Sequence, residues 1–268
     1  MGIKKSERAF ISPAPKNSRL FSVLYSLRGL TLFALALALW GSASWLLPAK
    51  HQYLFPAPWT TALALWESLP ELLRSTWSSF LILIPGYFLA VVLGAGWGVV
   101  VGSTKWLQAL FIPFARVAAP VPPTVYVPYA IALLPNFRSS AIAIVLVAAF
   151  WPVFLNSLAG TVAVSERHRD NARVLGFGPF EYLRLVAFPA ALPFIFSGMH
   201  VGLGMSFIML TVSELFGASS GLGRFVQYYA DFADYPRMVA GIIYTGLVTF
   251  LSMTALGSLE RRVIFWPH

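Results

Sequence analysis

One short segment of the chain, residues 165–193, combines side chains that could hold a partner protein. It reads SERHRDNARVLGFGPFEYLRLVAFPAALP and lies between two long apolar runs. Its pattern predicts two short helices, the first capped by Ser165 and ended by Gly176 in the left-handed conformation. Pro179 fits the first position of the second helix, and Pro189 is expected to end that helix. We call residues 165–193 the elbow.

The elbow is expected to present an apolar tip surrounded by arginines. The tip would consist of Ala172, Val174, Leu175, Phe177 and Phe180, with Arg167, Arg169, Arg173 and Arg184 around it. An exposed apolar surface of this kind suits the groove of a partner protein. The residues alone leave a second interpretation open, in which the elbow is an amphipathic segment that lies on lipid headgroups.

Covalent and metal chemistry find little support in the sequence. The chain has no Cys, so we predict neither disulfides nor thiolate metal sites. Its four His residues are scattered, with no pair at metal-ligand spacing on one helix face, so we predict no metal site and no catalytic residue. It also lacks a G-x-x-x-x-G-K-[ST] phosphate loop. We therefore expect a protein that is not an enzyme and does not hydrolyse ATP itself.

Composition places the chain among multi-pass membrane proteins. It is 58% hydrophobic and only 11% charged, with a mean hydropathy of +0.73, which excludes an ordinary soluble domain. The net charge of +9 does not indicate nucleic-acid binding, because the basic residues gather at the ends of apolar runs. The first 28 residues lack the early apolar core of a signal peptide, so the first apolar run is expected to be a retained span.

Apolar windows long enough to cross a bilayer predict six transmembrane helices, at 29–49, 75–104, 117–137, 139–165, 185–213 and 238–259. With the N-terminus inside, fourteen of the nineteen Lys and Arg residues fall in inside segments and five outside. The positive-inside rule then places both termini and the elbow in the cytoplasm. The predicted organisation is a cytoplasmic tail (1–28), a transmembrane domain (29–260) and a second cytoplasmic tail (261–268).

Two of the predicted spans carry glycines at close spacing. They are Gly94, Gly96, Gly98 and Gly102 in the second span and Gly198, Gly202 and Gly204 in the fifth. Spacings of four allow helices to approach closely. The third span differs, because it contains Pro120, Pro122, Pro123, Pro128 and Pro135. Proline kinks a helix and frees backbone carbonyls, so we expect this span to lie inside the bundle, beside a water-filled cavity.

Several elbow residues keep a specific spacing: Asp170-Asn171-Ala172, then Gly176, Val186 and Phe188-Pro189. This spacing resembles the EAA loop of binding-protein-dependent ABC importer permeases, in which Glu-Ala-Ala precedes Gly, Ile and Leu-Pro. Asp170 replaces the Glu, Asn171 the first Ala and Phe188 the Leu. The proline-rich third span and the region after Phe188, with a Glu followed by Gly-Leu-Gly, resemble the sulfonate, taurine and nitrate branch. The resemblance covers residues 75–260.

The resemblance implies a type I ABC importer permease fold: an all-α polytopic membrane protein of about six spans, with a cytoplasmic coupling loop between spans four and five. Two copies, favoured as a homodimer, would form one pathway in the bacterial cytoplasmic (inner) membrane. Two cytosolic ATP-binding subunits would carry ATP and Mg and hold the elbows. A periplasmic or lipid-anchored substrate-binding protein would deliver a small anion such as a sulfonate, taurine or nitrate. The chain itself would bind membrane lipid but no cofactor and no nucleic acid.

The resemblance also implies roles for particular residues. Coupling to the ATPase falls on Glu166, Asp170, Ala172, Arg173, Leu175, Gly176, Phe177 and Pro189. Candidate pathway residues are the polar span residues Tyr126, Asn156, Ser206, Thr211, Ser213 and Glu214. An acid within a span needs a partner or water, so Glu214 is expected to pair with an arginine, to gate the outer mouth or to lie at the headgroup boundary.

Two other classes of protein compete with this interpretation. One is a secondary transporter driven by an ion gradient, a class that often shows internal repeats with broken helices at the midplane. The chain shows no such repeat, and a gradient-driven carrier leaves the elbow unexplained. The other is a membrane scaffold that uses the elbow for docking and has no pathway. The prolines of the third span and the polar residues of the fifth argue against a scaffold.

Overall fold

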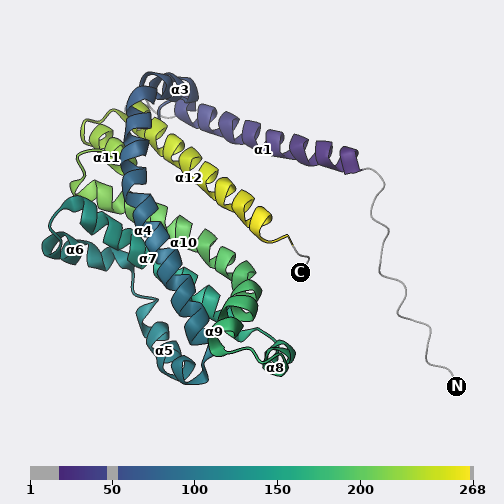
Figure 1. The fold of residues 1–268 in the computed structure, drawn as a ribbon. Helices are drawn as coiled ribbons and strands as arrows, with labels where there is room; N and C mark the ends of the chain where they lie inside the picture. The colour runs from purple at the N-terminus through teal and green to yellow at the C-terminus, as the bar shows by residue number, and fades with distance from the viewer. Residues whose placement is uncertain (1–17, 47–53, 266–268) are drawn as a thin grey trace. The chain divides into compact units, whose positions relative to one another are not determined.

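The computed structural model describes residues 18–46 and 54–265, and every regular element in these ranges is a helix, as predicted (Figure 1). The chain divides into two units, Met1–Thr60 and Thr61–His268, and each is considered by itself. The parts of the predicted tails at 1–17 and 266–268, and the end of the first predicted span at 47–49, lie outside the described residues.

The first unit contains one long helix, α1 (Ser18–Leu46). It starts at Ser18, within the predicted tail, and continues into the first predicted span. Residues Thr31–Leu46 of this helix are apolar. The indole N–H of Trp40 donates to the carbonyl of Pro56 at 3.1 Å, which ties the end of α1 to the segment before α3 (Pro58–Glu67).

The second unit contains the membrane bundle. Four helices of the described residues are long and apolar enough to cross a membrane: α4 (Leu69–Ser103), α7 (Phe137–Val162), the helix Pro179–Gly217 that includes α10 (Phe188–Gly217), and α12 (Tyr235–Val263). They cover the predicted spans at 75–104, 139–165, 185–213 and 238–259. The remaining helices of the bundle are short.

The predicted single span at 117–137 is wrong. The chain there forms α5 (Lys105–Ala118), a turn, a 3₁₀ helix (Pro123–Tyr126) and α6 (Val127–Leu133). The two halves are bent by 82°, so together they form a broken span or a re-entrant loop. The break coincides with Pro122, which precedes another proline and takes an extended backbone at φ −61° and ψ 126°. Consecutive prolines thus stop the helix that hydrophobicity alone predicted.

The glycines of α4 allow the close helix packing that was predicted. A Cβ at Gly98 would lie 2.7 Å from the Phe154 carbonyl oxygen, and one at Gly102 would lie 2.6 Å from Cβ of Thr161. Both neighbours belong to α7, which packs along α4 and α10. Gly198 of α10 meets α7 in the same way, 2.8 Å from the Pro152 carbonyl oxygen. Gly96, by contrast, faces open space. The bundle core is therefore α4–α7–α10, held at glycine contact distance.

The bundle has two distinct ends. The elbow, with α8 (Glu166–Val174) and α9 (Pro179–Tyr182), lies at one end, which we call the elbow end (Figure 1). The opposite end, which we call the distal end, carries α11 (Leu222–Asp231) and the start of α12. Because α10 runs from the elbow to the loop before α11, a single helix connects the two ends.

Candidate functional site

The elbow begins with α8, whose start differs from the prediction in one detail. Ser165 has the extended backbone of an N-cap, at φ −60° and ψ 146°, and Glu166 lies in the first turn. The Ser165 hydroxyl makes no capping bond and instead lies 2.6 Å from Nδ1 of His168. The predicted capping bond from the Ser165 hydroxyl is therefore wrong, because this hydroxyl bonds to the imidazole of His168, one turn further along, instead of to a backbone N–H.

The end of α8 is a Schellman turn, in agreement with the predicted stop at Gly176. This glycine has φ +75°, a left-handed conformation that costs other residues more. Its N–H donates to the Arg173 carbonyl, and the Phe177 N–H donates to the Ala172 carbonyl, each at 3.0 Å. These bonds satisfy two carbonyls that the helix end leaves free. The turn is thus closed by the elbow's own backbone.

The second elbow helix, α9, also starts as predicted, with Pro179 in its first turn. Glu181 reaches back and accepts a hydrogen bond from the Gly178 N–H at 2.8 Å. The prediction that Pro189 ends this helix is wrong. The chain passes through a π-helical turn, Leu183–Ala187, directly into α10. In that turn the Phe188 N–H donates five residues back, to Leu183, and such a bulge makes room for a proline that a regular helix would not accept.

The apolar tip of the elbow is exposed. Val174 is 87% exposed, Leu175 68% and Phe180 73%. The other two predicted tip residues differ, because Ala172 is buried inside the elbow and Phe177 is half-buried. The tip is therefore narrower than predicted, with Val174, Leu175 and Phe180 as its free surface.

Charged elbow residues surround this tip. Arg173 and Asp170 form an exposed ion pair at 3.2 Å. Glu166, Arg167 and Arg184 are exposed as well. Of the predicted coupling residues, Glu166, Asp170, Arg173, Leu175 and Gly176 are thus accessible, whereas Ala172 supports the fold and Phe177 and Pro189 are half-buried.

The predicted pathway residues lie on the 3₁₀ helix, α7 and α10. Ser206 and Ser213 are buried, and their hydroxyls donate to carbonyls of their own helix, Gly202 at 2.8 Å and Met209 at 2.7 Å. Asn156 likewise donates to the carbonyl of Pro152. Tyr126 is 37% exposed on the 3₁₀ helix. Thr211 lines a pocket of about 730 Å³ between α10 and α12.

Glu214, the acid predicted to pair with an arginine, to gate the outer mouth or to lie at the headgroup boundary, bonds to Ser79 and to the backbone of Gly223 at the distal end. Its side chain is fully buried, and it accepts hydrogen bonds from the Ser79 hydroxyl at 2.5 Å and from the Gly223 N–H at 2.6 Å. Ser79 in turn accepts from the Leu222 N–H at 2.9 Å. Gly221 has φ +145° and leaves no room for a Cβ beside the Glu214 carboxylate. We call Glu214, Ser79 and residues 221–223 the Glu214 anchor.

The sequence carried only part of the information on this anchor. The Gly-Leu-Gly after a glutamate was visible, and it corresponds to Gly221, Leu222 and Gly223. Ser79 was missed, because one serine in a long apolar run carries no signal of its distant partner. The partner lies 135 positions further along the chain.

A second group of polar contacts lies around α11. Arg237 contacts Asp234 at 2.8 Å and Glu67 at 3.2 Å, and the Tyr229 hydroxyl donates to Glu71 at 2.9 Å. Burial, together with the bond to Glu71, raises the pKa of Tyr229 to about 12, so its hydroxyl stays a donor at neutral pH. These residues were not predicted as a group. They join the start of α12 to the end of α3, and α11 to the start of α4.

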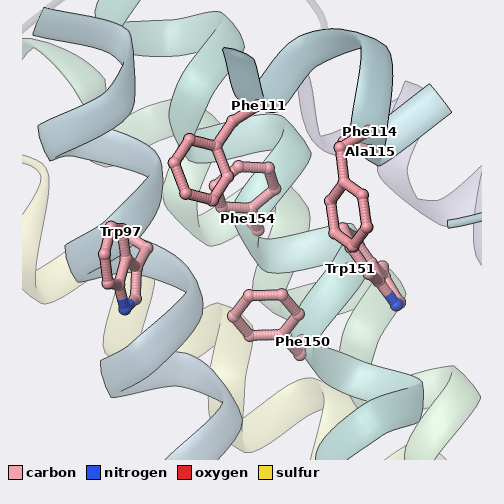
Figure 2. A pocket seen from close by; sticks show the side chains of 7 residues that line it. All are labelled: Trp97, Phe111, Phe114, Ala115, Phe150, Trp151 and Phe154. Atoms are coloured by element: carbon pink, nitrogen blue, oxygen red, sulfur yellow. The ribbon is translucent and has the colours of Figure 1, made fainter. Parts of the chain in front are cut away.

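An aromatic pocket of about 220 Å³ opens in the elbow half of the bundle (Figure 2). Its walls come from α4, α5 and α7, and its lining residues are Trp97, Phe111, Phe114, Ala115, Phe150, Trp151 and Phe154. Phe150 and Phe154 stack with ring centroids 5.6 Å apart, and Trp97 meets Phe111 at the same centroid distance. The grouping of these six aromatic rings was not predicted from the sequence.

A wider apolar groove of about 760 Å³ lies between α4, α10 and α12. Two tyrosine hydroxyls in it are already engaged: Tyr87 donates to the Met199 carbonyl, and Tyr244 accepts from Thr76. Among the residues that the structure describes, no three His, Asp or Glu side chains converge as metal ligands. The features that remain for function are the exposed elbow tip and the pockets of the bundle.

Comparison with known proteins agrees with this architecture. Residues 86–265 match the family described as binding-protein-dependent transport system inner membrane component. The chain is 30% identical over 179 residues to the nitrate import permease protein NrtB of Synechocystis sp., and 32% identical over 179 residues to the taurine transport system permease protein TauC of Escherichia coli. Each alignment covers 67% of this chain, and the aligned part spans 65% of the length of each relative.

The fold is also that of a solved transporter. The MetNI methionine ABC transporter, in an inward-facing conformation, superposes with a TM-score of 0.61 at 17% identity, over 74% of this chain and 98% of that chain. The likeness covers the multi-pass bundle and supports the type I importer permease fold. The family match extends over most of the chain and includes the elbow. This chain therefore belongs to the family of binding-protein-dependent transport system inner membrane components.

Proposed function

We propose that this chain is the membrane-spanning permease subunit of an ATP-driven importer. Its elbow would face the cytoplasm, with both termini on the same side of the bacterial cytoplasmic membrane. The observation that carries the proposal is the exposed apolar tip of Val174, Leu175 and Phe180 on a helix pair that caps itself. Such a tip at one end of a bundle of this family is suited to the groove of a cytosolic partner.

The way in which the elbow joins the bundle suggests how a movement would be transmitted. The helix Pro179–Gly217 is 39 residues long and continues through the π turn at Leu183–Ala187, or about 58 Å at 1.5 Å per residue. A force on the elbow would act directly on α10, and α10 ends at the Glu214 anchor. Closure of the partner on the elbow would thus move the distal end without a hinge between them.

The proposed partners follow from this division of work. Two ATP-binding subunits would hold ATP and Mg, while the permease itself binds no cofactor and is not an enzyme. A second copy of the chain would complete the pathway as a homodimer, with membrane lipid around it. A substrate-binding protein would dock at the distal end, which is the outer face in the proposed orientation.

The solute is proposed from the chemistry shared by the relatives. NrtB is named for nitrate and TauC for taurine, which carries a sulfonate. Both groups present three oxygens that share one negative charge. We therefore propose a small solute with an oxyanion group.

The decisive test disrupts the tip without disturbing the elbow fold. Leu175→Asp and Val174→Asp place a charge on exposed side chains, and Phe177 is left intact because its side chain is half-buried. We expect the wild-type chain, isolated in detergent from its native host, to bring down an ATP-hydrolysing subunit, and both variants to lose it. The matched control is Trp106→Asp, an exposed apolar residue (70%) outside the elbow.

The other outcomes identify the alternatives. If no ATPase copurifies with the wild-type chain, and the chain still supports solute uptake that a protonophore abolishes, the chain is a gradient-driven carrier. If it comes down with a different partner and supports no uptake, it is a scaffold. If Trp106→Asp loses the ATPase as completely as the tip variants, the tip is not the specific contact.

A further inference from the structure

A small polar pocket at the distal end has the chemistry of an oxyanion site. It has a volume of about 170 Å³ and lies where the first turn of α7, the outer part of α4 and the loop between α10 and α11 meet. Its polar lining consists of Arg138, Ser78, Ser219 and Ser220, and Leu81 and Phe137 provide apolar walls. A water molecule occupies about 30 Å³ in the liquid, so the pocket has room for a group of several heavy atoms.

Arg138 gives this pocket an available positive charge. Its guanidinium carries five N–H donors, and one of its nitrogens bonds to the Leu81 carbonyl at 3.3 Å. No ion pair within residues 18–46 and 54–265 involves Arg138, and no other charged residue lines the pocket. A guanidinium group with free N–H donors pairs best with a planar or three-oxygen anion, because two of its N–H groups can bond to two oxygens at once.

The serines are held in place around this arginine. The hydroxyls of Ser78 and Ser220 lie 2.8 Å apart, and Ser78 also lies 3.2 Å from the Ser220 carbonyl. The loop that carries Ser219 and Ser220 is fixed immediately afterwards by the Glu214 anchor. A pocket with fixed walls loses little conformational entropy when a ligand binds.

Glu214 does not line this pocket. Glu214 is fully buried beneath the loop, and its two oxygens accept from Ser79 and from Gly223 rather than facing the pocket. We propose that the Arg138 pocket receives the oxyanion group of the solute at the outer end of the bundle, before the solute enters the pathway. This proposal rests on the proposed function for its orientation and for its ligand class.

The same donors would also suit the phosphate of a lipid headgroup, so the test separates the two sources. The purified full chain in detergent is titrated with sodium nitrate and with sodium methanesulfonate, at ionic strength held constant with sodium chloride, and its melting temperature is followed. Ligand binding to the folded state raises the melting temperature. We expect a saturable rise in wild type, an at least tenfold weaker midpoint in Arg138→Gln, and an intermediate midpoint in Arg138→Lys.

The matched control is Arg74→Gln, which removes an exposed positive charge at the same end of α4. We expect it to titrate like the wild type. A rise that is equal in Arg138→Gln and wild type, or no rise beyond chloride, overturns the proposal. Native mass spectrometry from nanodiscs that contain phosphatidylglycerol tests whether Arg138 binds a lipid headgroup. If Arg138→Gln loses a bound lipid while its nitrate titration matches that of the wild type, Arg138 binds a headgroup and the proposal is overturned.

Failure of this proposal and failure of the proposed function are distinguishable. The titration needs no partner subunit, and the elbow test does not involve Arg138. Nitrate binding without a copurifying ATPase would leave an oxyanion site in a chain that is not an importer. A copurifying ATPase without nitrate binding would leave an importer whose solute is received elsewhere.

Discussion

The two ends of the bundle are built in opposite ways. At the elbow end, each helix terminus is closed by residues three to five positions away, as in the bonds from Gly176 to Arg173 and from Phe177 to Ala172. At the distal end, local bonds such as that between Arg237 and Asp234 are joined by bonds between residues far apart in the chain, as between Ser79 and Glu214 or between Tyr229 and Glu71. The elbow can therefore move as a preformed unit, whereas the distal end holds its shape only while three helices stay together.

This difference suits the proposed division of work. A surface that binds a partner gains from keeping its own fold and leaving its apolar side chains free, as Val174 and Leu175 are. The outer end of a pathway that must open and close is suited to hydrogen bonds that all form in the closed state and all break in the open state. The comparison predicts that mutations at the distal end act on the stability of the bundle, while mutations at the elbow act mainly on partner binding.

The largest effect is expected from Glu214→Ala. The change leaves the Ser79 hydroxyl and the Gly223 N–H buried without their acceptor, at a cost of about 3 kcal/mol or more. Hydrogen exchange should rise in α11 and in the loop before it, while the elbow remains unchanged. The measurement is hydrogen–deuterium exchange with mass spectrometry on the purified chain. Glu214→Gln keeps one acceptor and should lose less protection.

Protection in α11 that is identical in wild type and Glu214→Ala would contradict the anchor. So would an equal loss in the elbow and in α11, because it would show that the two ends are not independent.

A smaller effect is expected from Gly98→Ala, which tests the packing of α4 against α7 that connects the two ends. The new methyl group would meet Cβ of Ser157 at 2.6 Å and the Phe154 carbonyl oxygen at 2.7 Å, so α4 and α7 must separate at a cost of about 2 kcal/mol. Gly96→Ala is the matched control, because nothing lies within 4 Å of its Cβ. It should stabilise the helix by up to about 1 kcal/mol. Melting temperatures should therefore shift in opposite directions.

The difference between bonds of neighbouring residues and bonds of distant residues also explains which features could be predicted from the sequence. The end of α8 at Gly176, the start of α9 at Pro179 and the glycine contacts of α4 all follow from short patterns, and the structure has them. The Glu214 anchor and the Arg138 pocket depend on which helices pack together. That information is spread over 135 or more positions for Ser79 and Glu214, and no local pattern contains it.

The errors have equally specific causes. Hydrophobicity predicted one span at 117–137 because it does not register that Pro122 and Pro123 stop a helix together. Pro189 was predicted to end a helix because proline usually does, but the π turn before it accommodates the ring. In both cases backbone geometry, rather than side-chain polarity, decided the result.

At the elbow, Gly176→Val is expected to act locally. A β-branched residue at φ +75° costs about 1–2 kcal/mol or more, although there is open space around the position. The bundle should keep its melting temperature, while solute uptake and ATP hydrolysis in the reconstituted complex become uncoupled. Gly178→Ala, at φ −70°, is the control and should remain coupled. Full transport by Gly176→Val would remove the turn from the coupling surface.

The smallest structural effect is expected from Asp170→Asn. The ion pair with Arg173 is exposed on both sides, with 66% of the Asp170 side chain and 80% of the Arg173 side chain accessible, so its loss should cost no more than about 0.5 kcal/mol. A change this small cannot alter transport through stability. If Asp170→Asn nevertheless lowers uptake several-fold while the melting temperature stays constant, Asp170 acts on the partner. Arg173→Gln then shows whether Asp170 contacts the partner alone or together with Arg173. Equal losses of uptake in both single variants and in the double variant would show that the ion pair contacts the partner as one unit. Normal uptake in Arg173→Gln would leave Asp170 as the contact.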